Sequence, residues 1–103
     1  MDITKHLNHG TYDVTLSGKF TFNDHAQFRE ILQDIEGKDV RQVVLHMSGV
    51  DFVDSAALGM LLLALDEAEK HQKKLILSGA AGQVKKMFDM ARFDSLFNLQ
   101  AAS

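Results

Sequence analysis

Ser55 and two nearby aspartates, Asp51 and Asp54, are the side chains whose types and spacing first suggest chemistry. Paired carboxylates can perform acid-base catalysis or hold a divalent ion. No histidine or third carboxylate lies close to this pair in the sequence, so we expect neither role. An acid at a helix start is favoured by the helix dipole, and Asp54 is therefore interpreted as a cap or first-turn acid.

The hydroxyl of Ser55 could act as a nucleophile or as a helix cap. A serine hydrolase of this general class needs a Gly-x-Ser-x-Gly elbow with His and Asp partners. The stretch Val53-Asp54-Ser55-Ala56-Ala57 has no such elbow, so no catalytic residue is predicted. A serine at a helix start is most often a cap. From the residues alone, the role of Ser55 stays open.

The remaining candidates for chemistry are histidines and a glycine turn. The turn Gly79-Ala80-Ala81-Gly82 could cradle a phosphate at a helix N-terminus, but small residues between a strand and a helix explain it without a ligand. The histidines show no metal-ligand spacing such as i, i+4 on a helix, so we expect surface or structural roles and no metal site. They are His6, His9, His25, His46 and His71. No cofactor is predicted.

Length and composition favour one folded domain spanning residues 1–103. The net charge of −3 argues against a nucleic-acid partner, because such binders cluster Lys and Arg. The longest apolar run, residues 56–65, is about half the length that a membrane span needs. The chain has no cysteine and no secretory signal pattern, so we expect a cytoplasmic protein that does not contact membranes.

Strand and helix patterns alternate along the chain. Strands are predicted at residues 3–8 and 11–17, joined by a turn at His9-Gly10, and two buried strands at residues 40–47 and 74–78, the first of them central. Helices are predicted from Asn23 or Asp24 to Gly37, from Ser55 to His71, and after Gly82. A short segment, residues 94–99, closes the chain. The order predicts an α/β fold: a mixed, mostly parallel four-stranded sheet with an N-terminal antiparallel hairpin and packed helices.

Two predicted loops, residues 18–24 and 48–55, follow parallel strands and lead into helices. Binding sites in such folds gather at the carboxyl ends of the strands. We therefore expect Thr21, Phe22 and Asn23 to share one partner surface with the start of the second helix.

The stretch Phe52-Val53-Asp54-Ser55-Ala56-Ala57-Leu58-Gly59-Met60-Leu61 resembles the signature of the STAS domain of anti-sigma factor antagonists. The family pattern runs aromatic, apolar, Asp, Ser, Ser/Thr, Gly, Leu, Gly. The resemblance extends to residues 16–18, 43–45, 84–88 and 93–97, and the family's order of elements agrees with the order predicted above.

The resemblance implies a protein-interaction switch that is not an enzyme. In the family, an anti-sigma factor that is also a serine kinase phosphorylates the serine after the Asp, here Ser55, and a serine phosphatase reverses this. The unphosphorylated protein binds the anti-sigma factor, and the phosphorylated protein releases it. The residues expected to bind the partner are Thr21, Phe22, Asn23, Asp54, Ala56, Ala57, Leu58 and Gly59.

Two positions depart from the family pattern. Ala56-Ala57 replaces Ser/Thr-Gly, and Thr21 stands where many members carry an Asp. The first change removes an alternative hydroxyl, and the second indicates a different partner surface. The stretch of residues 18–25 looks like a branch that works beneath kinase and phosphatase modules coupled to response regulators.

Two alternatives compete with the switch. The chain could be a non-switching structural STAS subunit of a lipid-transport or stress-signalling complex. Retention of Asp54-Ser55 favours the switch, because a structural subunit needs no phosphorylatable serine. A receiver domain using Asp51 would need an acidic pair after its first strand and a later lysine, and neither is evident.

Overall fold

Strands and helices alternate along residues 1–100, the part of the chain that the computed structural model describes. Residues 101–103 of the predicted domain lie outside the described residues. The strands are β1 (Asp2–Asn8), β2 (Thr11–Phe20), β3 (Gln42–Val53), β4 (Lys74–Ser78) and β5 (Asn98–Gln100). The helices are α1 (His25–Ile35), α2 (Ser55–Lys70) and α3 (Gly82–Met90), with short 3-10 turns η1 (Phe22–Asp24) and η2 (Phe93–Ser95).

The five strands form one sheet in the order β1-β2-β3-β4-β5. The β1–β2 pair is antiparallel and the other pairs are parallel, which confirms the α/β class, the N-terminal hairpin and the central place of β3. The predicted number of four strands was one too low. The fifth strand, β5, has three exposed residues, too few to show an alternating pattern.

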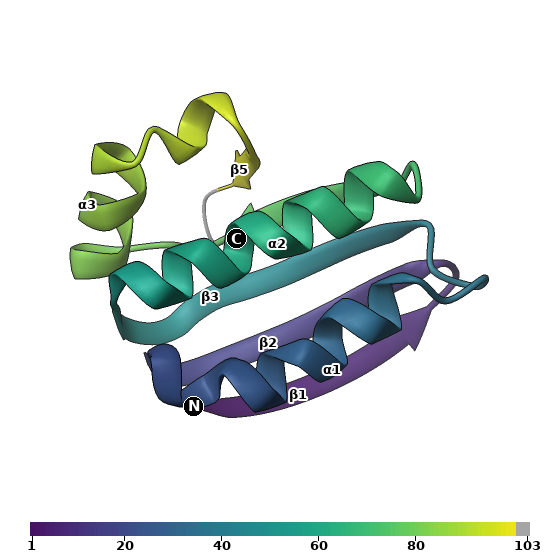
Figure 1. Cartoon of the computed structure of the whole chain (residues 1–103), viewed down its shortest axis with the longest axis horizontal. Helices are drawn as coiled ribbons and strands as arrows, with labels where there is room; N and C mark the ends of the chain where they lie inside the picture. Colours follow the sequence, from purple (N-terminus) through teal and green to yellow (C-terminus); the bar gives the residue numbers. More distant parts are fainter. Residues whose placement is uncertain (101–103) are drawn as a thin grey trace.

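One face of the sheet carries the hydrophobic core. Alternate residues of β2 and β3, Val14 and Leu16 in one and Val43 and Leu45 in the other, are fully buried and join a single cluster with apolar residues of all three helices. In Figure 1, α1 and α2 lie side by side in front of the sheet. Right-handed crossovers between neighbouring parallel strands place successive helices on the same face.

The strands β2 and β3 run further than predicted, through stretches expected to be loops. Gly18 pairs with Val50, and Phe20 pairs with Val53. The register shifts twice, between Thr15 and Ser17 and again between Gly18 and Lys19. Each bulge breaks the two-residue alternation that identifies a strand in sequence. The extensions carry both strands to the edge of the sheet from which η1 and α2 begin.

Candidate functional site

Asp54 joins the two segments that follow β2 and β3. One carboxylate oxygen, Oδ1, accepts a hydrogen bond from the backbone amide of Ala57 at 2.8 Å and so caps α2. The other, Oδ2, accepts from the amide of Phe22 at 3.1 Å. The structure thus confirms Asp54 as a helix cap and confirms that the two segments lie together at one edge of the sheet.

Ser55 is the first residue of α2 and is exposed. Of the roles left open for Ser55, the helix cap is excluded, because Asp54 makes the capping bond one position earlier. Among residues 1–100, no hydrogen bond ties the Ser55 hydroxyl to a histidine or a carboxylate. The hydroxyl therefore faces solvent at a helix N-terminus, where the first backbone amides lack intrahelical partners and attract negative charge.

Gln83, on the first turn of α3, holds the end of β3 in place. Its side-chain oxygen accepts from the amide of Val53 at 3.0 Å, and its side-chain nitrogen donates to the carbonyl of Val53 at 3.0 Å. The side-chain amide of Gln83 thereby makes the hydrogen bonds that a neighbouring strand would make, at a position beyond the end of β4. Sequence analysis missed Gln83, because only the folded chain brings it beside the residue that precedes Asp54.

The turn η1 presents Phe22 to solvent. The buried side chain of Asp24 accepts from the amide of Thr21 at 2.8 Å, which fixes the start of the turn. Phe22 is 62% exposed, and its ring stacks on His25 with centroids 5.0 Å apart. An exposed phenylalanine held by a hydrogen-bonded turn is a ready contact for a partner.

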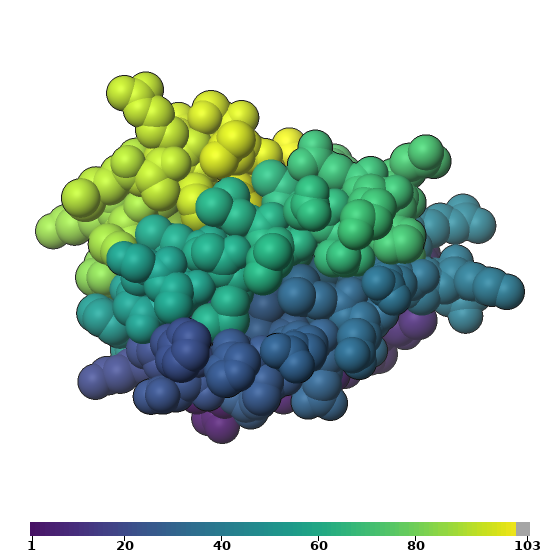
Figure 2. All heavy atoms as spheres, viewed as in Figure 1, coloured from purple at the N-terminus to yellow at the C-terminus, as the bar shows by residue number. Residues whose placement is uncertain are grey.

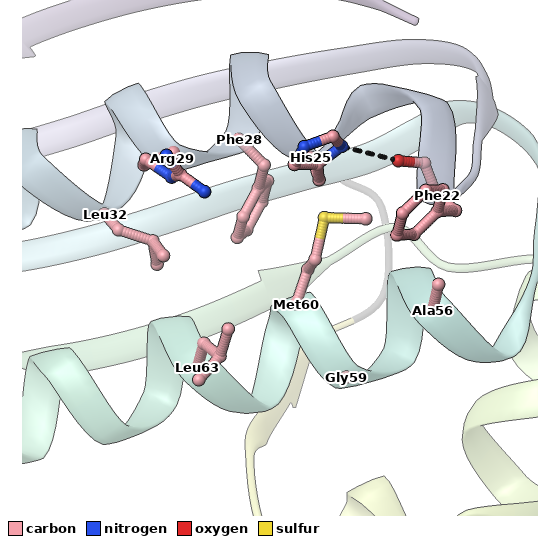
Figure 3. A pocket seen from close by; sticks show the side chains of 9 residues that line it. All are labelled: Phe22, His25, Phe28, Arg29, Leu32, Ala56, Gly59, Met60 and Leu63. Atoms are coloured by element: carbon pink, nitrogen blue, oxygen red, sulfur yellow. Dashed lines mark hydrogen bonds between the residues drawn. The ribbon is translucent and has the colours of Figure 1, made fainter.

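A mostly apolar groove runs between α1 and α2 and is lined by Ala56, the residue after Ser55. Figure 2 shows the side chains of α1 (blue) and α2 (teal to green) meeting along this face, and Figure 3 shows Met60 reaching from α2 toward α1. The cavity has a volume of about 540 Å³. Its lining residues are Phe22, His25, Phe28, Arg29, Leu32, Ala56, Gly59, Met60 and Leu63.

The predicted partner-binding residues divide into three groups. Phe22, Ala56 and Gly59 line the groove, and Asn23 is exposed next to it. Ala57 is fully buried, so its side chain cannot contact a partner and is not part of the partner surface. Three others contribute in part: Leu58 packs half-buried against the core, and Thr21 and Asp54 shape the turn mainly through hydrogen bonds.

Other sequence candidates lie apart from this site. Asp51 is exposed on β3, and its carboxylate forms no hydrogen bond or ion pair within the described residues. His46 approaches Asp13 on β2 with its Nε2 2.7 Å from Oδ1. The turn before α3 uses two glycines at positive φ, Gly79 and Gly82, and a Cβ on Gly79 would crowd Ser48 at 3.0 Å. Among the helices of residues 1–100, none is long and apolar enough to cross a membrane.

Comparison with known proteins places the chain in a family. The model of the STAS domain matches residues 2–103, so the chain belongs to the STAS domain family. A STAS-domain containing protein of Pseudomonas aeruginosa is 29% identical over 86 residues, covering 84% of each chain. The anti-sigma-B factor antagonist of Staphylococcus aureus is 19% identical over 88 residues, covering 85% of this chain and 82% of its own.

Solved structures share the fold. The anti-sigma-factor antagonist (STAS) domain protein of Planctomyces limnophilus has a TM-score of 0.86 at 14% identity, covering 100% of this chain and 92% of its own. The anti-sigma factor antagonist SpoIIAA in its unphosphorylated form has a TM-score of 0.76 at 17% identity, covering 99% and 89%. A sulfate transporter family protein of Wolinella succinogenes also matches, with a TM-score of 0.79 at 20% identity, covering 95% and 82%.

Proposed function

We propose that the chain is an anti-sigma factor antagonist that works as a phosphorylation-controlled interaction switch. The observation that carries the proposal is the exposed Ser55 at the N-terminus of α2, directly after the capping Asp54 and beside the exposed Phe22. Relatives named as antagonists support it, as does SpoIIAA, whose fold is known in unphosphorylated and phosphorylated forms. The protein acts by binding and is a kinase substrate rather than an enzyme.

The partner in this proposal is an anti-sigma factor with serine kinase activity. It contacts the surface formed by Phe22, Asn23, Ala56 and Gly59 around Ser55, together with the groove between α1 and α2. Apolar side chains of the partner enter the groove, where burial is worth about 25 cal/mol per Å² of apolar surface. A serine phosphatase, in one arrangement linked to a response regulator, restores the unphosphorylated state.

Phosphate on Ser55 switches binding off through its charge. It adds about −1.5 to −2 charges and a shell of bound water at the centre of the contact surface. A partner that packs over Ala56 and Gly59 must strip this water or clash with the phosphate. A penalty of about 3 kcal/mol weakens the affinity by roughly a hundredfold.

Mass spectrometry of the protein purified from its own cells tests the modification, with phosphate expected on Ser55. Calorimetry with the kinase-type anti-sigma factor of the same cells tests the switch. Ser55→Ala cannot be phosphorylated and is expected to bind the partner whether or not the kinase is active. Ser55→Glu is expected to bind at least about tenfold more weakly than wild type. Equal binding by wild type, Ser55→Ala and Ser55→Glu would contradict the switch.

A second candidate is a non-switching STAS subunit of a larger assembly, such as a lipid-transport complex. The likeness to a sulfate transporter family protein favours it, because that STAS fold belongs to a transporter family. In this case Ser55 carries no phosphate, and Ser55→Glu assembles like wild type.

A further inference from the structure

A second cluster of chemically active side chains lies at the other ends of α1 and α2. Glu36 follows the last residue of α1, Glu67 lies in the last turn of α2, and His71 follows that helix. One carboxylate oxygen from each glutamate and one imidazole nitrogen of His71 all lie within 4.8 Å of one another. Figure 1 shows both helix ends at the same end of the sheet, opposite to the start of α2. Ser55 is the first residue of α2.

Glu67 carries an oxygen that the protein leaves unsatisfied. Its Oε2 is shielded from solvent and accepts no hydrogen bond from any of residues 1–100. The nearest cationic partner is His71, whose Nε2 lies 3.5 Å away, and the other oxygen, Oε1, lies 3.4 Å from Nζ of Lys70. A shielded carboxylate oxygen that accepts no hydrogen bond is costly, and a bound metal ion is one way of satisfying it.

The surrounding charges are compatible with a cation. Two helix C-termini, each with the negative end of its dipole, meet at the cluster. Lys73 donates hydrogen bonds to the backbone carbonyls of Ile35 and Gly37, so its charge is engaged with the end of α1. Lys70 is largely exposed and shares Glu67 with His71. Neither lysine forms an ion pair with Glu36 within the described residues.

We propose that Glu36, Glu67 and His71 form a zinc site that ties the C-terminal end of α1 to that of α2. Two carboxylate oxygens and one imidazole nitrogen suit Zn²⁺, whereas Mg²⁺ and Ca²⁺ prefer oxygen ligands alone. Zinc bonds of about 2.1 Å separate tetrahedral ligand atoms by about 3.4 Å. The ligand atoms lie within 4.8 Å of one another, so rotation of the exposed Glu36 side chain would bring its oxygen into bonding distance, with water as the fourth ligand.

The sequence obscured this site for a simple reason. Glu67 and His71 have the i, i+4 spacing that places two ligands on one helix face, but only one of them is a histidine. The third ligand, Glu36, comes from the preceding helix and becomes a neighbour only when α1 packs against α2. The metal binds the folded state and not the unfolded state, so it stabilises the folded chain by mass action.

Calorimetry with ZnCl2 and metal-free protein tests the site. We expect one Zn²⁺ per chain with micromolar affinity, and affinities lower by roughly tenfold or more in His71→Ala and Glu67→Gln. His6→Ala, at an exposed position on β1, is the matched control and should bind like wild type. MgCl2 and CaCl2 should give no saturable heat.

Imidazole resonances in the NMR spectrum identify the ligand directly, since the chain has five histidines. On addition of ZnCl2, the His71 resonances should shift at stoichiometric metal while those of His6 and His25 stay. Glu36→Gln, an exposed change that leaves the packing intact, must also weaken binding. Equal zinc binding by wild type, His71→Ala and Glu36→Gln, or no binding at micromolar zinc, would overturn the proposal.

Discussion

The carboxylate of Asp54 accepts a hydrogen bond from the backbone amide of Phe22 at 3.1 Å, across 32 positions of sequence. The same carboxylate caps α2 through the amide of Ala57. One side chain therefore caps the helix that begins at Ser55 and holds the backbone of Phe22, whose exposed ring lies beside that helix. The surface that we propose for the partner depends on this residue even where the partner does not touch it.

Replacing Asp54 with alanine should lower the free energy of unfolding by about 1–2 kcal/mol, because a helix cap is lost. Urea denaturation measures the change. Asp51→Ala is the control, since Asp51 is exposed and should change stability by no more than about 0.5 kcal/mol. Equal stability of Asp54→Ala and wild type would show that the two hydrogen bonds contribute nothing.

Two phenylalanines near the groove should respond in opposite ways. Phe22 is 62% exposed and Phe28 is fully buried. Phe22→Ala should leave the free energy of unfolding within about 0.5 kcal/mol of wild type but weaken partner binding, and Asn23→Ala should behave similarly. Phe28→Ala should cost about 3–5 kcal/mol of stability. A loss of stability in Phe22→Ala that matches its loss of binding would assign Phe22 to the core.

Regular elements could be predicted closely from sequence, because their patterns are undisturbed. β4 spans the predicted residues 74–78, and α2 starts at Ser55 as expected and ends one residue early. The ends of β2 and β3 could not be predicted, because the bulges near Ser17 and Gly18 hide their alternation. Burial of Phe20 and Val53 becomes clear only when these two residues are paired across the sheet.

The site could be predicted in part for similar reasons. The nearness of residues 21–23 to the start of α2 follows from parallel strands that end at the same edge. The contact of Gln83 with Val53 joins residues 30 positions apart through side-chain geometry, which no periodic pattern encodes. The sequence pattern also could not decide whether Asp54 or Ser55 caps the helix, because both residue types cap helices well.

Gln83→Ala should leave both the amide and the carbonyl of the buried Val53 without partners. The expected cost is about 1–3 kcal/mol, the penalty for unsatisfied buried polar groups. Hydrogen exchange of the Val53 amide, followed by NMR, should become faster, whereas Gln27→Ala on the exposed face of α1 should leave it unchanged. Unaltered protection of Val53 in Gln83→Ala would argue that water replaces the side chain without loss.

Substitutions at Ser55 should change stability far less than those at Asp54. Ser55→Ala removes no capping bond and should stay within about 0.5 kcal/mol of wild type. Ser55→Glu gains roughly 0.3–1 kcal/mol from the helix dipole and loses a similar amount to the neighbouring Asp54. Thermal melts of both variants should therefore overlay that of wild type. A large loss in Ser55→Ala alone would return the capping role to the serine.

Tyr12 makes stability fall at alkaline pH. Burial, reinforced by the hydrogen bond that its hydroxyl donates to Asp34, raises the pKa of Tyr12 far above its ordinary value of 10.0. Below pH 10 the folded and unfolded chains both keep the proton, and the hydrogen bond contributes fully. Above pH 10 the unfolded chain loses the proton and the folded chain keeps it, so the unfolded state is favoured by about 1.4 kcal/mol per pH unit.

Absorbance of tyrosinate follows this directly, because Tyr12 is the one tyrosine of the chain and tryptophan is absent. Wild type should show no ionisation near pH 10 and then a steep rise that coincides with the loss of helical circular dichroism. Tyr12→Phe should be less stable at pH 7 by about 1 kcal/mol, the worth of the hydrogen bond. The stability of Tyr12→Phe should decline less than that of wild type between pH 10 and 12. Both proteins carry the same lysines, so the difference between them reports on Tyr12. Simple titration of the folded protein near pH 10 would show that the Tyr12 hydroxyl is open to water and that its bond to Asp34 has no influence on alkaline stability.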